Sequence, residues 1–540
     1  MCAEFVRVSR KPLRKTINFI LKNMKKICSI LVIAAAAMSV FAEVKMPAIF
    51  SNNMVFQQGK PINIWGTAKP NSVVKAYFNF KFTETKADKN GKWKMSLPAE
   101  KASYKDYALT MFEDGFPSKK ISNILVGEVW IAGGQSNMEF RVNRSCDFEK
   151  AKASADKLYG KLRYFLQSSA GFSRVPKTEF QPGAKWIEVD GKNVELMSAV
   201  SFYFAEKLIP ALDVPVAIVY SSKGAASMET WSERGKILQT PWGKKEFAQA
   251  FKDLDAYDQA KYKKLLAAHK KKMADRAALI AKCKAENKPV PKVRWDYSIP
   301  PNDQSPQYDY KTPSLHFNGK IVPLGNFVVR GVIWYQGESN AGGEKVGHFS
   351  DSFRVLIESW RDSLGDADLP FLQVQLASYG TTSQWPRARQ AQYENTKLFK
   401  NVYMAPICDT GQKDDIHPVQ KTIPGQRLAD IALAKIYGKN ICADAPVLKA
   451  VSYDGDTATV KFQTFDGPLA VKGKPRGFET LSNGKWTTAN VSVNGGDVLV
   501  KSADGSEIRG VRYAWKCWNA PEVCLFGNNG FPALPFESLK

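Results

Sequence analysis

The sequence predicts an α/β protein in which a parallel sheet, covered by helices on both faces, is flanked by two β-rich domains. The chain has 540 residues and is 44% hydrophobic, so it can bury a large core and exceeds one ordinary domain. Its middle alternates continuous apolar runs with amphipathic stretches, which is typical of strands buried on both faces of a parallel sheet. Both ends of the mature chain instead show short alternating strands and turns.

Residues 1–42 are predicted to be a targeting leader. The segment "MKKICSILVIAAAAMSVFA" (24–42) has a basic start, an apolar stretch and a small-x-small end, which predicts cleavage near Ala42. Initiation at Met24 would give a more typical signal peptide. The apolar part is shorter than the roughly 20 residues that span a bilayer, and no later segment is long and apolar enough. We therefore expect an exported protein, periplasmic or secreted, without a membrane span.

Three domains are predicted after the leader. Residues 43–123 form an N-terminal β domain, because "SVVKAYFNFKF" (72–82) alternates and Lys-Pro and Asn-Gly turns separate the runs. Residues 124–444 form the α/β domain, interrupted by a Lys/Ala/Leu-rich helical insertion at 233–300. Residues 445–540 return to short strands and form a C-terminal β domain. Sandwich-like packing is expected for both β domains.

In the α/β domain the predicted strands are 125–132, 214–222, 327–336, 370–378 and 401–409, and the predicted helices are 198–212, 350–364, 388–398 and 425–438.

The net charge of +25 raises the question of a nucleic-acid partner. The most basic stretch, residues 261–276, is interleaved with Leu and Ala at helical spacing, so a solvated helix face is the better interpretation. An exported protein also rarely meets nucleic acid, and no such partner is predicted.

Six cysteines remain after the leader, and none shows the spacing of a metal site, so no metal is predicted. Cys517 and Cys524 lie close in sequence, in what looks like two strands joined by a turn, and a local disulfide bond is favoured there. The pairing of the other four is left open.

The motif "GGQSNMEF" (133–140) ends the apolar run "ILVGEVWIA" (124–132) on two glycines and a serine. This is either a tight turn or a nucleophile held at a strand-to-helix corner. A nucleophilic Ser136 requires a base and a group that orients the base. Among four histidines, His417 in "DDIHP" follows the last predicted parallel strand, and Asp414 precedes it by three residues. We predict His417 as the base and Asp414 as its orienting carboxylate.

Donors for an oxyanion are predicted at other strand ends. Gly224, in "SSKGAAS" (221–227), can bring its backbone N–H close to a substrate oxygen, and Asn340, in "WYQGESNA" (334–341), offers a side-chain N–H. The backbone N–H of Ser136 completes the predicted oxyanion hole. Each of these residues alone has an ordinary role in a turn or a helix cap. Active sites of parallel sheets lie beyond the carboxyl ends of the strands, and here four strand ends carry the required groups. This combination favours catalysis.

This order of serine, glycine, asparagine and Asp-x-x-His resembles the SGNH hydrolase superfamily. The motifs "GQSNME", "IWYQGESNA" and "DIHP" resemble its sialate O-acetylesterase family, which also includes acetylxylan esterases. The resemblance implies a flavodoxin-like, three-layer α/β/α core. It also implies hydrolysis of acetyl esters on sugars, sialic acid or acetylated xylan and other plant glycans, with no cofactor.

In this family Ser136 would attack the acetyl carbonyl and His417 would carry the proton. Glu338, in the "QGE" motif, is a possible second acid that competes with Asp414. Gln135 and Gln336 are predicted to bind the substrate. The chain departs from the family at "SKGAAS", where Ala225 stands in place of a more typical second glycine.

Two other functions are weighed. A carbohydrate-binding protein on a defunct hydrolase core is disfavoured because Ser136, Asp414 and His417 are all present. A glycosidase that pairs Glu338 with Glu229 has no need of Ser136. An α/β-hydrolase is excluded, because its serine lies in Gly-x-Ser-x-Gly.

Overall fold

The computed structural model describes residues 43–168, 171–256, 258–291, 312–380, 384–494 and 496–540. The predicted leader, residues 1–42, lies outside the described residues. Within the described ranges no helix is long and apolar enough to cross a membrane. The described chain forms two compact units. The smaller comprises residues 43–45, 65–95 and 109–120, and the larger comprises residues 46–64, 96–108 and those from 121 onward.

The smaller unit is built on antiparallel strands. Strand β3 (Val73–Phe78) pairs with β4 (Lys81–Lys86), and on its other side with residues 109–113 of β6 (Ser103–Glu113). Alternate β3 side chains, Val74, Ala76 and Phe78, are buried, as the alternation of the sequence predicts. The two-residue turn at Asn79 and Phe80 has positive φ at both positions, which matches the twist of a tight hairpin.

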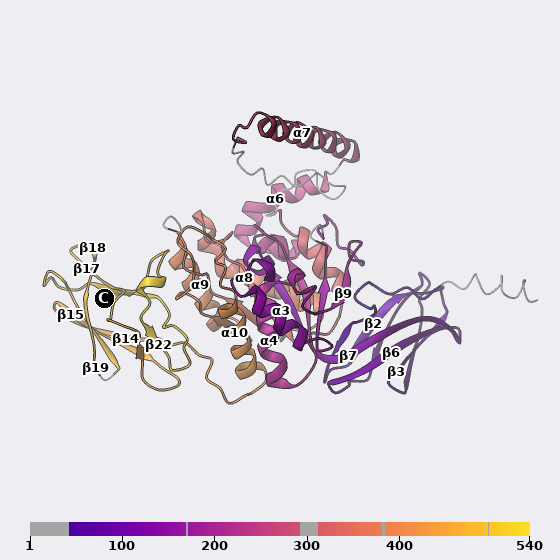
Figure 1. Cartoon of the computed structure of the whole chain (residues 1–540), viewed down its shortest axis with the longest axis horizontal. Coiled ribbons are helices and arrows are strands. Elements are labelled where there is room, and N and C mark those ends of the chain that lie inside the picture. The colour runs from indigo at the N-terminus through magenta and orange to yellow at the C-terminus, as the bar shows by residue number, and fades with distance from the viewer. Residues whose placement is uncertain (1–42, 169–170, 257, 292–311, 381–383, 495) are drawn as a thin grey trace, which may run out of the picture. The chain divides into compact units, whose positions relative to one another are not determined.

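The larger unit contains the predicted parallel sheet, with strands in the order β13-β12-β11-β7-β10-β8-β9. Strands β7 and β9 are labelled in Figure 1. All pairs are parallel except β8 with β9. The five predicted strands are present, and β8 and β9 extend the sheet. The strands are β7 (Phe116–Gly134), β8 (Leu162–Leu166), β9 (Lys185–Glu188), β10 (Val216–Ser222), β11 (Gly331–Tyr335), β12 (Phe371–Val374) and β13 (Val402–Ala405). Numbered along the chain, the five predicted strands lie in the order 2-1-3-4-5, so the order reverses at β7. Sheets of this order bind ligands at that reversal, beyond the strands' carboxyl ends.

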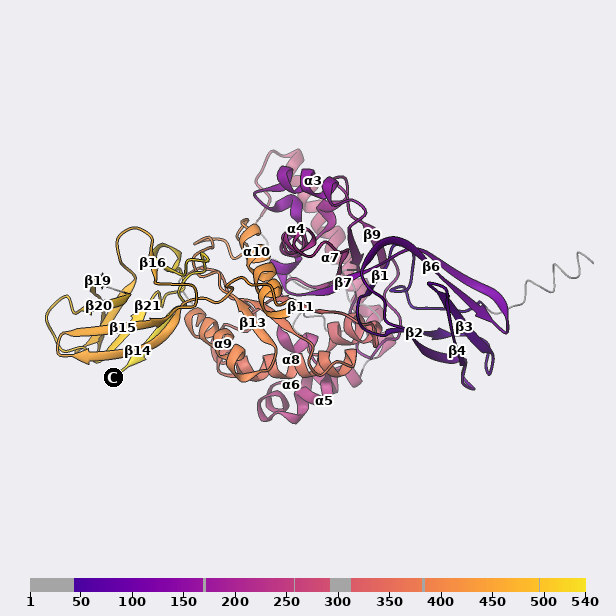
Figure 2. The ribbon, with the colours of Figure 1, turned by 90° about the horizontal axis from the view of Figure 1, so that it is seen from below.

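Helices cover both faces of this sheet. Figure 2 shows α3 (Phe148–Lys157) and α4 (Ala199–Leu212) on one side, and α8 (Phe349–Leu364) and α9 (Trp385–Leu398) on the other. Helix α10 (Thr422–Ile431) packs with α4. On the α8 face the buried rings of Trp334 and Trp360 meet edge to face, with centroids 5.7 Å apart. The four helices predicted for this domain are therefore present.

The predicted insertion is helical over its described part. It contains α5 (Arg234–Gln239), α6 (Pro241–Asp255) and α7 (Gln259–Ala285), and Thr240 caps α6 by accepting the N–H of Gly243. Residues 292–300 of the predicted insertion lie outside the described residues.

The C-terminal strands form two four-stranded antiparallel sheets, β14-β15-β20-β19 and β18-β17-β21-β23, around a common apolar core. Their bounds are β14 (Val447–Asp454), β15 (Thr457–Gln463), β17 (Phe478–Ser482), β18 (Lys485–Thr488), β19 (Asn490–Asn494), β20 (Asp497–Lys501), β21 (Gly510–Tyr513) and β23 (Phe536–Leu539). The prediction of a Cys517–Cys524 disulfide bond was wrong, because no disulfide bond joins these two cysteines. Buried Cys524 instead contacts the backbone of Arg476 through its Sγ, while the Cys517 carbonyl accepts from Arg389.

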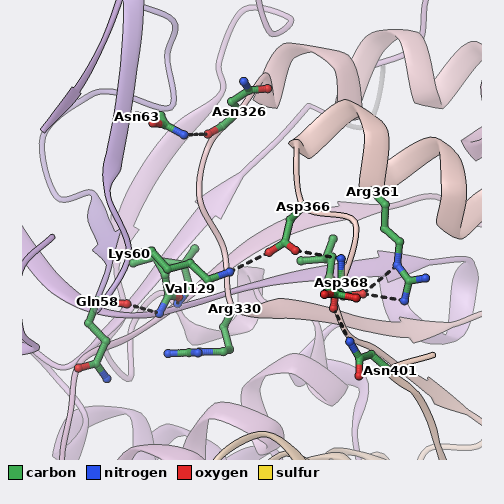
Figure 3. A network of polar contacts seen from close by, with 12 residues as sticks. Gln58, Lys60, Asn63, Val129, Asn326, Arg330, Arg361, Asp366, Asp368 and Asn401 are labelled. Carbon is green, nitrogen blue, oxygen red and sulfur yellow. Dashed lines mark hydrogen bonds and ion pairs between the residues drawn. The ribbon is translucent and has the colours of Figure 1, made fainter. Parts of the chain in front are cut away.

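Polar contacts tie down the loops at the amino ends of the strands (Figure 3). Lys60 pairs with Asp366 at 2.8 Å, and the Asn401 side chain donates to the carbonyl of Asp368 at 2.8 Å. Arg330, at the start of β11, binds the buried Glu128 carboxylate through two nitrogens, at 2.7 and 3.1 Å. These contacts fix the end of the sheet opposite to the polar motifs.

Candidate active site

The two glycines of the "GGQSNMEF" motif allow close backbone packing at the end of β7. A Cβ at Gly133 would lie 2.9 Å from the rings of Trp334 and Trp360, and one at Gly134 would lie 2.2 Å from the carbonyl oxygen of Tyr335. Gly134 also has φ of +142°, which side chains rarely permit. Sequence therefore dictates a sharp corner, after which the short helix α2 (Ser136–Glu139) begins at Ser136.

Ser136 and His417 meet beyond the strand ends. His417 Nε2 lies 2.8 Å from Ser136 Oγ, although the two residues are 281 positions apart. At this distance the hydroxyl can donate its proton to a neutral imidazole, which is the geometry that activates a serine nucleophile. The corner after β7 and the loop after β13 thus bring together the predicted nucleophile and base.

The loop that carries His417 is shaped by Asp415. Its Oδ1 accepts the backbone N–H of His417 at 2.8 Å and lies 3.7 Å from His417 Nδ1. Such a side chain-to-backbone bond two residues on defines a local turn. The carboxylate beside Nδ1 is therefore that of Asp415, the residue next to the predicted Asp414, because this turn directs Asp415 back toward the ring. Asp414 is exposed.

The surroundings of His417 favour its neutral form. Burial is the main cause that lowers the pKa of His417 below its ordinary value, Asp415 opposes it, and the positive charge of Lys421 adds to the lowering. A neutral imidazole is the form that can accept the proton of Ser136.

A pocket of about 620 Å³ opens over this pair. It is lined by Gln135, Ser136, Glu139, Lys223, Gly224, Ala225, Glu338, Ser339, Gly342, Lys345, Ile416 and His417. The lining comes from the ends of β7, β10 and β11 and from the His417 loop, so the residues lie where the strand order reverses.

Three kinds of comparison relate this chain to carbohydrate esterases. A family model described as carbohydrate esterase, sialic acid-specific acetylesterase, matches residues 318–434. Sialate O-acetylesterases of mouse and human are each 25% identical, over 74% and 91% of this chain and the same shares of their own length. The structure of a carbohydrate acetylesterase from Xanthomonas citri aligns with a TM-score of 0.74 and 29% identity, over 92% of this chain and 99% of that one. Residues 318–434 therefore carry a sialic acid-specific acetylesterase domain, and the similarity to sialate O-acetylesterases extends over most of the chain. This chain is a carboxylic ester hydrolase.

Gly224 lies against the nucleophile of the esterase, but its N–H is engaged. A Cβ at Gly224 would be 3.6 Å from the Cβ of Ser136, so the backbone is as close as predicted. The Gly224 N–H donates to Glu139 Oε2 at 2.6 Å. The next residue, Ala225, has φ of +60°, the conformation for which glycine is the usual choice. The N–H at Gly224 thus already binds an anionic oxygen inside the pocket.

Asn340 and Gln336 do not line the pocket of the esterase. The Asn340 amide donates to Glu229 Oε1 at 2.8 Å, and its oxygen accepts from Gln336 at 2.7 Å and from the Met228 N–H at 3.1 Å. The oxyanion role of Asn340 and the substrate contact of Gln336 therefore stay predictions that the lining of this pocket does not support. Their side chains turn into the protein because they join the 226–229 segment to the end of β11. Glu229 is buried in the same network and, unlike Glu338, does not line the pocket.

Gln135 and Glu338 do line the pocket of the esterase. Gln135 Oε1 accepts the N–H of Ser339 at 3.2 Å. Glu338 Oε1 accepts from Asn137 Nδ2 at 2.5 Å, whereas Oε2 has no hydrogen-bond partner among the described residues. Burial raises the pKa of Glu338, and the bond from Asn137 and the charge of Lys421 oppose that rise.

Sequence reasoning missed Asn137, Glu139 and Lys421. The first two lie in the motif that carries Ser136, and Lys421 is four residues after His417, so proximity along the chain was the available signal. Two of the other three histidines have different surroundings: His316 bonds to Thr230, and His348 stacks on Trp242. In the described part of the chain no group of three or more His, Cys, Asp or Glu could hold a metal ion.

Proposed function

We propose that the protein is an exported serine esterase that removes acetyl groups from sugars through an acyl-enzyme. The observation that carries the proposal is the 2.8 Å contact between Ser136 Oγ and His417 Nε2 inside the pocket. Similarity to sialate O-acetylesterases supplies the reaction class.

In the proposed mechanism Ser136 Oγ attacks the acetyl carbonyl while its proton passes to His417 Nε2. The protonated imidazole then gives this proton to the departing sugar hydroxyl, which leaves an acetyl ester on Ser136. Water, deprotonated by His417, attacks that ester, and acetate departs as the proton returns to Ser136 Oγ. Asp415, rather than Asp414, accompanies the imidazolium that forms, since it lies 3.7 Å from Nδ1.

The proposed oxyanion hole uses the backbone N–H groups of Ser136 and Gly224. The Glu139 carboxylate must leave Gly224 before a substrate oxygen can take its place, because one N–H cannot serve both well. Asn340 is not part of this proposal, because it does not line the pocket and its amide donates to Glu229.

For the substrate we favour an O-acetylated sugar that carries a carboxylate, as sialic acid does, over acetylated xylan. Lys223 and Lys345 line the pocket and attract an anion, although Lys345 also pairs with Glu246 at 3.3 Å. The curated relatives named above are sialate O-acetylesterases, which supports the same choice.

We further propose the finer architecture predicted from the sequence. The 2-1-3-4-5 strand order supports an SGNH, flavodoxin-like core at 124–444. The paired antiparallel sheets around one core support a sandwich-like domain at 445–540. The N-terminal β domain at 43–123 and the leader at 1–42 complete this proposal.

The test is acetate release by the purified mature protein, with Ser136→Ala as the control. O-acetylated sialic acid and acetylated xylo-oligosaccharide are compared side by side. Release that is lost in the variant supports the esterase, and the preferred substrate decides between the two sugars. No release from either substrate, with an aryl acetate also intact, would favour a binding protein. Reducing sugar released from unacetylated glycan would favour a glycosidase.

A further inference from the structure

Asn137, the residue after the nucleophile, connects three segments of the active site. Its side chain is 1% exposed. Nδ2 donates to the carbonyl oxygen of Ile416 at 2.9 Å and to Glu338 Oε1 at 2.5 Å, and Oδ1 accepts from Lys421 Nζ at 2.6 Å. Ile416 immediately precedes His417. One amide therefore joins the corner that carries the nucleophile to the loop that carries the base.

Only one orientation of this amide satisfies its partners. Two of them, the Ile416 carbonyl and the Glu338 carboxylate, are acceptors, and the third, the Lys421 ammonium, is a donor. A flipped amide would bring its oxygen against both acceptors and its NH₂ against the ammonium. The ammonium of Lys421 thus selects the orientation in which Asn137 can hold Ile416.

Lys421 is held where an ammonium group is costly to bury. It is fully buried, 4.6 Å from the ring centroid of Phe140 and 5.7 Å from that of Tyr335. Burial lowers the pKa of Lys421 to about 7, and the charges of Glu338 and Asp415 oppose this lowering. A buried lysine needs partners, and Lys421 Nζ donates to Asn137 Oδ1 at 2.6 Å.

We propose that Asn137 and Lys421 are positioning residues that hold the His417 loop against Ser136, with Lys421 fixing the orientation of the Asn137 amide. This inference rests on the proposed function, because it concerns the same Ser136–His417 pair. Neither residue touches the reacting atoms. Their loss lets the Ile416 carbonyl drift, and the 2.8 Å contact between His417 and Ser136 lengthens with it. A misplacement of about 1 Å between reacting groups costs about 10²-fold in rate.

The experiment measures kcat and KM for 4-nitrophenyl acetate in Asn137→Asp, Lys421→Met and Lys421→Arg. Asn137→Asp keeps the side-chain shape but removes the donor to Ile416. Lys320→Met is the matched control, because Lys320 is also fully buried but donates only weakly, at 3.4 Å, to the carbonyl of Ser222. Asn137→Ser, a smaller polar change, is measured as well, and it replaces Asn137→Asp if that variant fails to fold.

Asn137→Asp and Lys421→Met are expected to lower kcat about 10²-fold with KM within about 3-fold, and Lys320→Met to lower kcat much less. The double variant Asn137→Ser with Lys421→Met should lose no more than the worse single variant, because both act through one amide. The positive charge of Lys421 lowers the pKa of His417, so Lys421→Met should raise that pKa. The acidic limb of the pH profile of kcat, where kcat falls as His417 becomes protonated, should then move to higher pH. Lys421→Arg keeps the charge and should leave that limb in place.

The positioning role would be overturned if the folded Asn137 and Lys421 variants kept kcat within 2-fold of wild type. It would also be overturned if they lost no more kcat than Lys320→Met does. Additive losses in the double variant would overturn it too. Failure of the proposed function is a different result: wild-type protein would then leave the aryl acetate intact, or Ser136→Ala would retain turnover.

Discussion

Replacing Asp415 by Asn tests how much the carboxylate beside His417 contributes to catalysis. The substitution keeps an oxygen that can accept the backbone N–H of His417, so the turn that shapes the loop is retained. It removes only the negative charge 3.7 Å from Nδ1. Asp414→Asn is the matched control, because it removes the same charge one residue earlier in the same exposed loop.

The expected effect of Asp415→Asn is small. Two unit charges 3.7 Å apart attract by about 1 kcal/mol in water. The Asp415 side chain is 55% exposed, so the stronger attraction of a buried pair does not apply, and measured exposed pairs contribute about 0.2–1 kcal/mol. About 1 kcal/mol less stabilisation of the imidazolium corresponds to a loss of about 5-fold in kcat/KM. A buried, hydrogen-bonded triad carboxylate would instead cost about 10⁴-fold.

The assay is kcat/KM for 4-nitrophenyl acetate against pH, at low and at high salt. Asp415→Asn should move the acidic limb to lower pH, because Asp415 raises the pKa of His417. High salt should bring wild type closer to the variant, because ions screen exposed charges. A loss of 10³-fold or more in Asp415→Asn, or a larger loss in Asp414→Asn, would refute the assignment of a weak, exposed partner at Asp415.

Three further predictions concern the site and the sheet that supports it. Burial lowers the pKa of His417, so kcat/KM should stay high below the ordinary pKa of histidine and fall only as pH drops through the lowered value. A fall in the kcat/KM of wild type that begins above pH 7 would contradict this. Gly224→Ala should lower kcat about 10-fold without unfolding the protein, because the new methyl group lies 2.8 Å from Glu139 Oε2 and shifts an oxyanion donor. An unchanged kcat would remove Gly224 from the proposed oxyanion hole. Glu128→Gln should lower the free energy of unfolding by about 3 kcal/mol in urea, because Arg330 loses a fully buried carboxylate partner. The control is Glu358→Gln, which breaks an exposed helical ion pair and should change that free energy by less than about 0.5 kcal/mol.

The sequence by itself determined the reaction class, the parallel sheet and the meeting of Ser136 with His417. Strands buried on both faces are continuous apolar runs, and helices between them require parallel pairing, so polar motifs after successive strands must gather at one edge. The glycines before Ser136 add a local signal, because they permit the close packing that makes the corner.

Only the tertiary structure decided which side chains at that edge face the pocket. Asn340 and Gln336 turn toward Glu229 and the 226–229 segment, Asp415 Oδ1 lies 3.7 Å from His417 Nδ1, and Lys421 reaches Asn137 from 284 residues away. The physical reason is that a hydrogen bond requires atoms within about 3 Å and correctly directed. A strand pattern places residues at the same edge, but the direction of each side chain depends on partners that distant segments supply.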